Sequence, residues 1–205
     1  MRYGLVTDIH NNLQNLGKVL AKLEELGVDQ IVTLGDTVDP MAPPEGADEV
    51  AQLLIDKNAI GVWGNHDIFF TQDIASMNFE GFDAPTMQLM GRMEAQLELG
   101  FCHVSHRESN LDPNDGEQMW QGCDGRVDLF ELSKKAFRAS RSEVQLLGHY
   151  HGWWAGTPTA KLNWKGEAEL HFENDQRYFV VVAPVLSGCG AILDLQTRVL
   201  TPVQA

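Results

Sequence analysis

This 205-residue chain has few cysteines, few basic residues and no long apolar run. Its three cysteines, Cys102, Cys123 and Cys189, are widely spaced and form no CxxC pair, which favours reduced thiols over a disulfide framework. No stretch approaches the ~20 consecutive apolar residues of a membrane span. The opening stretch, MRYGLVTDIH, contains too short an apolar run for a secretory signal. We therefore expect a cytoplasmic protein that does not bind membranes.

Positive charge is scarce, with 15 Lys and Arg against 29 Asp and Glu and a net charge of -14. This balance argues against binding to long nucleic acids or to anionic membranes, because both would repel the chain. It does not exclude a small anionic substrate, since bound cations can reverse the field within one pocket. The length and the absence of a linker or repeat indicate a single domain over residues 1–205.

The first half of the chain alternates between two kinds of pattern. Short apolar runs predict strands at 3–8, 29–36 and 59–67, and apolar residues at helical spacing predict helices at 13–27 and 46–58. Gly27 provides a suitable C-terminal end for the first helix. Strands that alternate with helices across short loops are typical of an α/β protein with a mostly parallel sheet.

The second half is less regular. We expect helices at 86–99 and 128–140, strands ending at His106 and His151, and a loop-rich segment at 107–125. Beyond Trp153 the pattern predicts strands and turns, with further strands at 177–184 and 191–196. The stretch NWKGEAELHF, residues 163–172, is interpreted as a hairpin.

Polar side chains follow five of the predicted strands. The strand ends read Asp8-Ile9-His10, Gly35-Asp36 with Asp39 three residues on, Gly64-Asn65-His66-Asp67, Ser105-His106 and Gly148-His149-Tyr150-His151. The carboxyl ends of strands in an open α/β sheet lie along one edge, where ligands bind. These side chains should therefore converge from distant parts of the chain.

The converging groups form a mixed set of nitrogen and oxygen ligands. Such a set suits Mn, Fe, Zn, Ni or Co better than Mg or Ca, which prefer oxygen alone. There are too many ligands for one ion, and a carboxylate can bridge two ions about 3.5–4 Å apart, as in two-metal phosphoester hydrolysis. Each motif has an ordinary alternative, such as a Gly-Asp turn or an Asx turn with a helix N-cap. All five motifs in this order, each at a strand end, argue against those alternatives taken together.

The series DIH, GDTVD, GNHD, SH and GHYH resembles the calcineurin-like metallophosphoesterase family. The stretch VTDIHNNLQNL is similar to the SDIHGNLEAL opening of small bacterial and archaeal phosphodiesterases of that family, and YFVVVAPVLSGCGAILDL is similar to its closing motif. The resemblance implies a two-sheet β-sandwich flanked by helices, the α/β/β/α metallophosphoesterase architecture.

The resemblance also implies roles for individual residues. Asp8, His10 and His151 would hold one metal, Asn65, His106 and His149 would hold a second, and Asp36 would bridge the two. His66 would not be a ligand. It would stabilise the transition state or protonate the leaving oxygen, with Asp39 orienting it, and Asp67 would orient or cap.

Several positions depart from the family pattern. Asn11 replaces the glycine that usually follows the first His, a mild change because Asn tolerates the left-handed conformation. Arg107 follows His106 where glycine is usual, and either contacts a substrate phosphate or is solvated. Pro40 replaces an Arg of the protein Ser/Thr phosphatase branch, which disfavours a phosphoprotein substrate. The altered closing motif leaves a homo-oligomer open.

Aromatic residues flank the motifs at Trp120, Tyr150, Trp153 and Trp154. They could stack on a nucleobase, but packing is the favoured interpretation. His103 lies three residues before His106 and should point to the opposite face, as a core or surface residue without a ligand role.

These observations predict a dinuclear metal-dependent phosphoesterase with two divalent ions, Mn favoured. Metal-activated water would hydrolyse a small phosphodiester or nucleotide, with His66 assisting the leaving group. The alternative is a metal-binding scaffold or regulatory protein on the same fold. A metallo-β-lactamase-like hydrolase is disfavoured, because it would need an HxHxDH run and the chain has none.

Overall fold

The computed structural model describes residues 1–71, 82–120 and 127–205. Its helices are α1 (Leu13–Glu25), α2 (Ala47–Asp56), α3 (Ile68–Thr71), α4 (Ala84–Met90), α5 (Gly116–Trp120), α6 (Leu129–Ala139) and the short 3₁₀ helix η1 (Val185–Ser187). Its strands are β1 (Arg2–Val6), β2 (Gln30–Leu34), β3 (Ile60–Val62), β4 (Leu97–Leu99), β5 (Cys102–Val104), β6 (Val144–Leu147), β7 (Trp154–Gly156), β8 (Leu170–His171), β9 (Tyr178–Val181), β10 (Cys189–Asp194) and β11 (Val199–Gln204).

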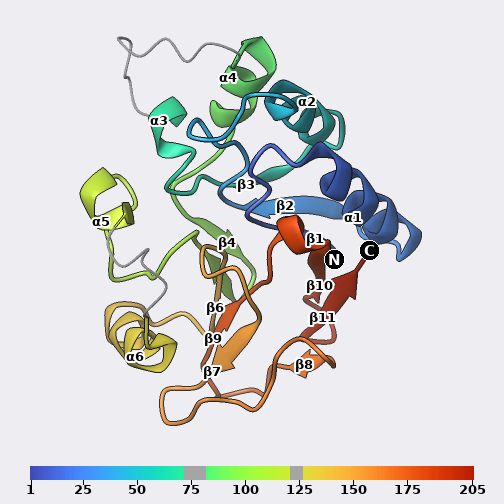
Figure 1. Ribbon diagram of the computed structural model, residues 1–205. Coiled ribbons are helices and arrows are strands. Elements are labelled where there is room, and N and C mark those ends of the chain that lie inside the picture. Colours follow the sequence, from blue (N-terminus) through green and yellow to red (C-terminus); the bar gives the residue numbers. More distant parts are fainter. Residues whose placement is uncertain (72–81, 121–126) are drawn as a thin grey trace.

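The strands form two sheets (Figure 1). A six-stranded sheet has the order β3-β2-β1-β10-β11-β8, and a five-stranded sheet has the order β4-β5-β6-β9-β7. Within them, β1 pairs in parallel with β2 and β2 with β3, while β5 pairs in parallel with β6 and β6 with β9. Four of the nine strand pairings in the described residues are parallel and five are antiparallel, so the expectation of a mostly parallel sheet holds for β1 to β3 but not for either whole sheet.

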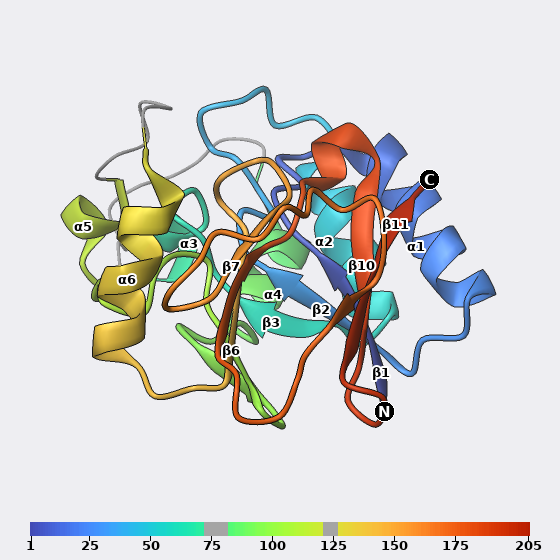
Figure 2. The ribbon, with the colours of Figure 1, turned by 90° about the horizontal axis from the view of Figure 1, so that it is seen from below.

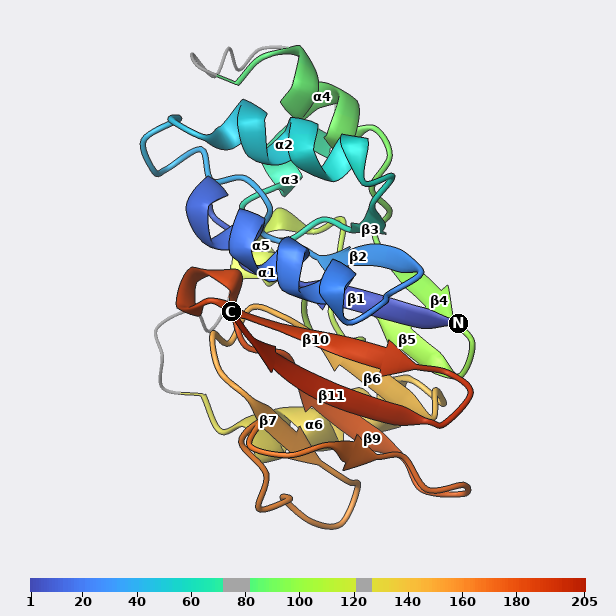
Figure 3. The same cartoon turned by 90° about the vertical axis from the view of Figure 1, so that its right-hand side faces the viewer.

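The layers run helix, sheet, sheet, helix (Figure 2). In Figure 3, α1 and α2 lie on the outer side of the six-stranded sheet, with α6 beyond the five-stranded sheet. The predicted two-sheet sandwich flanked by helices is confirmed.

Alternation along the strands explains these layers. Leu5 of β1 packs between the two sheets, whereas its neighbour Val6 packs toward the helices on the outer face. In β9, Val180 packs between the sheets and Phe179 packs toward α6. Because neighbouring side chains of a strand point to opposite faces, a sheet covered on both sides is apolar at successive positions.

The predicted helix at 13–27 is confirmed as α1, whose buried residues Leu16, Val19, Leu20 and Leu23 recur at helical spacing. Asn12 caps its start by accepting a hydrogen bond from the Asn15 backbone N–H (3.0 Å). Leu26 is the C-cap, and Gly27 follows it with φ of +74°, a left-handed conformation that glycine adopts readily.

Two predicted elements in the second half are wrong. The helix expected at 86–99 ends at Met90, and the chain then enters β4. The hairpin expected at 163–172 does not form, because β8 pairs with β11. Trp164, Leu170 and Phe172 are all buried in the core between the sheets. The path of this segment is therefore set by the burial of these side chains and not by a local hairpin turn.

Two further findings bear on the initial expectations. Cys102 and Cys189 are buried free thiols, and Cys123 lies outside the described residues. Among the helices that the structure describes, none has the length and apolar character needed to cross a membrane.

Candidate metal centre

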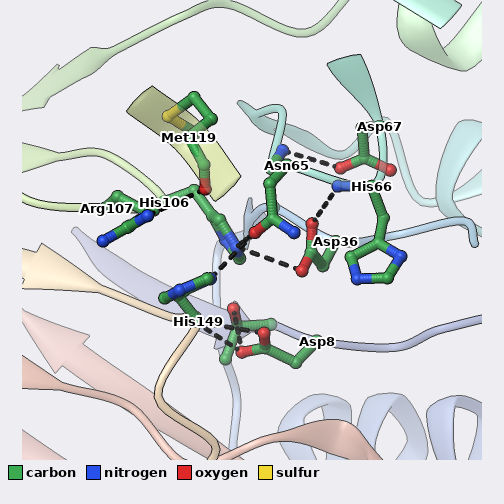
Figure 4. Close-up of polar contacts among 12 residues, drawn as sticks. Asp8, Asp36, Asn65, His66, Asp67, His106, Arg107, Met119 and His149 are labelled. Carbon is green, nitrogen blue, oxygen red and sulfur yellow. Dashed lines mark hydrogen bonds and ion pairs between the residues drawn. The ribbon is translucent and has the colours of Figure 1, made fainter. Parts of the chain in front are cut away.

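The five polar motifs meet at the carboxyl ends of the parallel strands. Asp8 follows β1, Asp36 follows β2, Asn65 follows β3, His106 follows β5 and His149 follows β6. Figure 4 shows these side chains pointing toward one another from both sheets. The predicted convergence is therefore present, but the side chains come from the strand ends of two packed sheets and not from the edge of one sheet.

The backbone at this edge is unusual. Positive φ angles occur at Asp8 (49°), His10 (46°), Asp36 (51°), His149 (68°) and His151 (50°). Such angles are uncommon for residues other than glycine, and they persist where the surrounding structure enforces them. The turns at the strand ends therefore direct the side chains inward at some cost in backbone energy.

Two glycines allow the loops to approach each other closely. A Cβ at Gly64 would overlap the carboxylate and backbone N of Asp36, and a Cβ at Gly148 would overlap the hydroxyl of Thr7. A side chain at either position would push neighbouring motifs apart. This explains why glycine precedes Asn65 and His149 in the sequence.

Asn65, His106 and His149, together with Asp36, form one group of adjacent polar side chains, which we call the inner group. His106 Nε2 lies 3.1 Å from Asp36 Oδ2 and 3.1 Å from Asn65 Oδ1, and His149 Nδ1 lies 2.8 Å from the same amide oxygen. His106 Nδ1 donates to the backbone carbonyl of Leu34 (2.7 Å), which places the lone pair of the neutral ring on Nε2. The lone pairs of a nitrogen, a carboxylate oxygen and an amide oxygen then face one another.

That arrangement fits a cation. Burial opposes charge on His106, but the adjacent Asp36 carboxylate outweighs it and raises the pKa of His106 to about 9. A proton on Nε2 can therefore be shared with the Asp36 carboxylate and the Asn65 amide oxygen. A divalent ion in its place would bind the nitrogen and both oxygens at once. Nitrogen and oxygen donors in this mixture match the ligands of transition metals.

An outer group lies beside the first. His151 Nε2 is 3.2 Å from Asp8 Oδ1, and ligand atoms of Asp8, His10 and His151 all fall within 4.8 Å of one another. His10 Nε2 is buried and has no hydrogen-bond partner in the described structure. It lies 3.8 Å from Asp36 Oδ2, the oxygen that also faces His106. One carboxylate oxygen therefore faces both groups.

Asp39 connects the outer group to His66. Its Oδ2 accepts from His10 Nδ1 (3.0 Å), and its Oδ1 accepts from His66 Nδ1 (2.8 Å). Burial alone would raise the pKa of Asp39, but these two hydrogen bonds hold it well below its usual range. The contact with His66 was expected from the sequence, whereas the contact with His10 was not. It leaves His10 Nε2 free to bind an ion, a common arrangement behind a ligating histidine.

His66 lies beside Asp39 on the more solvent-exposed side of these residues. Its backbone N–H donates to Asp36 Oδ1 (2.9 Å), and its side chain is 18% exposed. Burial lowers its pKa, but the hydrogen bond with Asp39 and the charge of Asp36 outweigh this, so that the pKa of His66 is raised. A protonated imidazole held in this way is suited to donate a proton.

Two residues that the sequence left in minor roles hold the loops together. The Asn11 side chain accepts from the Asp39 backbone N–H (2.9 Å) and donates to the carbonyls of Asp39 and Pro43. The Asp67 carboxylate accepts from the backbone N–H groups of Thr37, Val38 and Gly64. Asn11 thereby fixes the loop that carries Asp39, and Asp67 joins the loops that carry Asp36 and Asn65.

Arg107 is not solvated, which was one of the two interpretations that the sequence left open. It is buried, with Nε donating to Glu108 Oε2 (3.2 Å) and Nη1 donating to the carbonyls of Gln118 (3.1 Å) and Met119 (2.8 Å). The side chain therefore ties the segment after His106 to helix α5. A charged residue beside a ligand motif gives no sequence signal for such a contact, because its partners lie eleven and twelve residues away.

The flanking aromatics divide into two kinds. Trp153 packs against Trp164, Trp154 packs against Phe179 and Tyr150 lies edge-on to His149. Trp120, like Tyr150, lies against a histidine of the site, because its ring contacts that of His66. His103 is buried in β5, and its Nδ1 bonds with Glu98 (2.6 Å) instead of the site.

Comparison with known proteins places these features in a family. The Calcineurin-like phosphoesterase superfamily domain matches residues 1–180 of the chain. An uncharacterized protein from Methanocaldococcus jannaschii is 40% identical over 63 residues, which are 31% of this chain and 25% of that protein. The match thus spans about a quarter of that relative.

Solved structures share the fold over nearly the whole chain. A metallophosphoesterase from Sphaerobacter thermophilus superposes with a TM-score of 0.77 at 20% identity, covering 98% of this chain and 86% of the other. A hypothetical protein from Pyrococcus horikoshii OT3 gives 0.69 at 13% identity, with 100% and 87% covered. A novel archaeal phosphodiesterase gives 0.53 at 14% identity, with 99% of each chain covered.

Proposed function

Because this chain belongs to the calcineurin-like phosphoesterase superfamily, a family of metal-dependent enzymes, we propose that it hydrolyses a small phosphodiester or nucleotide at a dinuclear metal centre. The observation that carries the proposal is the position of Asp36 Oδ2, which faces His10 of the outer group and His106 of the inner group. One bridging carboxylate between two incomplete ligand groups is the arrangement that two adjacent ions require.

We assign the ligands in two sets that share Asp36. Asp8, His10 and His151 would hold one ion, and Asn65, His106 and His149 would hold the other. The mixed donors favour Mn, Fe, Zn, Ni or Co, with Mn the first choice. Two divalent ions at these positions would lower the pKa of a water molecule and neutralise phosphate oxygens.

The chain's own residues would handle the proton of the leaving group. Water adds to phosphorus, the bond from phosphorus to the leaving oxygen breaks, and that oxygen takes a proton from His66 Nε2. Asp39 holds His66 through Nδ1, so the other ring nitrogen is available to the substrate. The raised pKa of His66 favours the protonated form that a general acid needs.

A diester is favoured over a phosphoprotein. Pro40 follows Asp39 where the protein phosphatase branch of the family has an arginine, and a structural neighbour is described as a phosphodiesterase. The test is hydrolysis of bis-p-nitrophenyl phosphate with Mn, compared with p-nitrophenyl phosphate and with a chelator present. We expect turnover of the diester that the chelator abolishes.

The second candidate is a metal-binding scaffold with little activity. Loss of ligands is typical of such proteins, and every ligand position is filled here. The scaffold reading predicts two bound ions per chain without turnover of either nitrophenyl ester. Metal analysis alongside the same assays separates the two candidates.

A further inference from the structure

Two aromatic side chains, Trp120 and Phe69, lie close to His66, the proposed general acid. The ring of Trp120 lies 4.7 Å from that of His66, centroid to centroid, with the planes inclined at 56°. Phe69 of α3 lies 6.4 Å from Trp120 on the same measure. Two elements from different parts of the chain, α3 and α5, thus bring large aromatic rings to the His66 side of the site.

The position of Trp120 is built into the fold. Arg107 is buried and donates to the carbonyls of Gln118 and Met119, the two residues that precede Trp120. Met119 is buried, and Asp115 accepts from the backbone N–H groups of Glu117 and Gln118 at the start of the helix. Asp115 therefore holds the start of α5, and Arg107, the residue after His106, holds the two residues that precede Trp120.

Trp120 lies on the same side of the site as His66, and this position determines which part of a substrate Trp120 would contact. A general acid must lie within hydrogen-bond reach of the leaving oxygen, so the leaving group must lie beside His66. Any group attached to that oxygen then approaches the neighbouring indole. An indole ring stacks on planar aromatic groups, and every nucleobase offers such a face.

We propose that Trp120 is a specificity-determining residue that stacks on the nucleobase of the substrate's leaving portion. The inference rests on the proposed function and deepens it, because it names a nucleoside phosphate ester as the substrate class. Trp120 does not take part in the reaction. It would raise the affinity for a nucleotide over a sugar phosphate with the same phosphate group.

The test compares two ligands that differ only in the base. The Mn-loaded protein is titrated calorimetrically with adenosine 5′-monophosphate and with ribose 5-phosphate. Stacking on one base is typically worth about 5- to 100-fold in affinity, and we expect the wild-type protein to prefer the nucleotide by about that factor. In Trp120→Ala the ratio of the two affinities should fall toward one, and Trp120→Phe should keep most of it.

Phe130→Ala is the matched control, because it removes an aromatic ring of α6 that contacts Lys134. It should keep the wild-type ratio. Equal weakening of both ligands by Trp120→Ala would overturn the proposal, since Trp120 would then act by supporting His66. Unchanged affinities for both ligands would also overturn it and leave Trp120 as a packing residue.

Failure of this inference is separable from failure of the proposed function. Hydrolysis of bis-p-nitrophenyl phosphate by the wild-type protein tests the phosphoesterase itself and needs no nucleobase. A protein that hydrolyses this ester but shows no preference for the nucleotide would refute only the role of Trp120.

Discussion

The inner and outer ligand groups share Asp36 but differ in how firmly they are held. In the inner group, Asn65 is 2% exposed and His106 is 1% exposed, and the backbone carbonyl of Leu34 fixes the His106 ring. In the outer group, the His151 side chain is 46% exposed, and its contact at the site is with Asp8. Asp8 of the outer group is also buried and His10 is held by Asp39, so the two groups differ chiefly in the solvent-exposed imidazole of His151.

This difference leads us to expect that two ions, if both groups bind one, would be held unequally. Ligands that are already oriented lose less conformational entropy when an ion binds, so the inner site should bind more tightly. The outer site is closer to solvent and to His66, and it should exchange its ion more readily. The predictions below test this contrast, starting with the residue that both groups share.

Asp36→Asn should have the largest effect, because it removes the charge that faces both groups. We expect loss of both ions and of detectable diester hydrolysis. Metal analysis after desalting and an assay with bis-p-nitrophenyl phosphate measure the two losses. The control is Asp29→Asn, an exposed carboxylate that accepts from the Arg2 backbone N–H. Retention of two tightly bound ions in Asp36→Asn would contradict the bridging role.

His66→Ala should leave both groups intact while slowing turnover. General acid catalysis is typically worth about 10²–10⁴-fold, and we expect a loss of that order on diesters with alkoxide leaving groups. The loss should be much smaller for a nitrophenolate, which leaves without a proton. Equal losses on both kinds of ester would favour charge stabilisation over proton donation, and a lower metal content would make His66 a ligand.

A pair of substitutions compares the two groups directly. His106→Ala should weaken the inner ion and His151→Ala the outer ion, each by at least the roughly 10- to 100-fold that loss of an outer-shell partner costs. Stepwise titration with Mn should show one tight and one weak site in the wild-type protein, with only the weak step altered by His151→Ala. Two identical sites would remove the contrast.

His103→Ala is the matched control for His106→Ala, since both histidines are buried in or just after β5. It should change only thermal stability, because His103 bonds with Glu98 and not with the site. Loss of metal from His103→Ala would show that the site extends further along β5 than the structure indicates.

Asn11→Gly should have the smallest effect on activity among the substitutions in the site, and it restores the residue usual in the family. It removes the side chain that holds the Asp39 loop, while glycine keeps the left-handed conformation at φ of +62°. A hydrogen bond contributes about 1 kcal/mol, so a loss of about threefold to tenfold in kcat is expected with metal content unchanged. Asn11→Asp retains the acceptor for the Asp39 N–H and should recover part of the rate.

Much of the fold follows from local patterns. Helix α1 and strands β1 to β3 have clear periodicity, and Gly27 ends the first helix as expected. Of the mispredicted elements, β8 depends on a distant partner, whereas β4 pairs with the neighbouring strand β5. Strand β8 exists because β11 offers it a partner, and the chain between Met90 and Leu97 changes from helix to strand without a proline.

The sequence by itself determined which side chains gather at the sheet edge. Each motif directly follows a strand, and parallel pairing brings the ends of β1 to β3 together in one sheet and the ends of β5 and β6 together in the other. The packing of the two sheets on each other, which the tertiary structure decides, then brings the two sets of strand ends together. Only the tertiary structure decided what Arg107, Asn11 and Trp120 do. Their partners come from loops and a short helix whose positions depend on packing between layers, and hydrogen bonds to backbone carbonyls leave no pattern in the sequence of the partner.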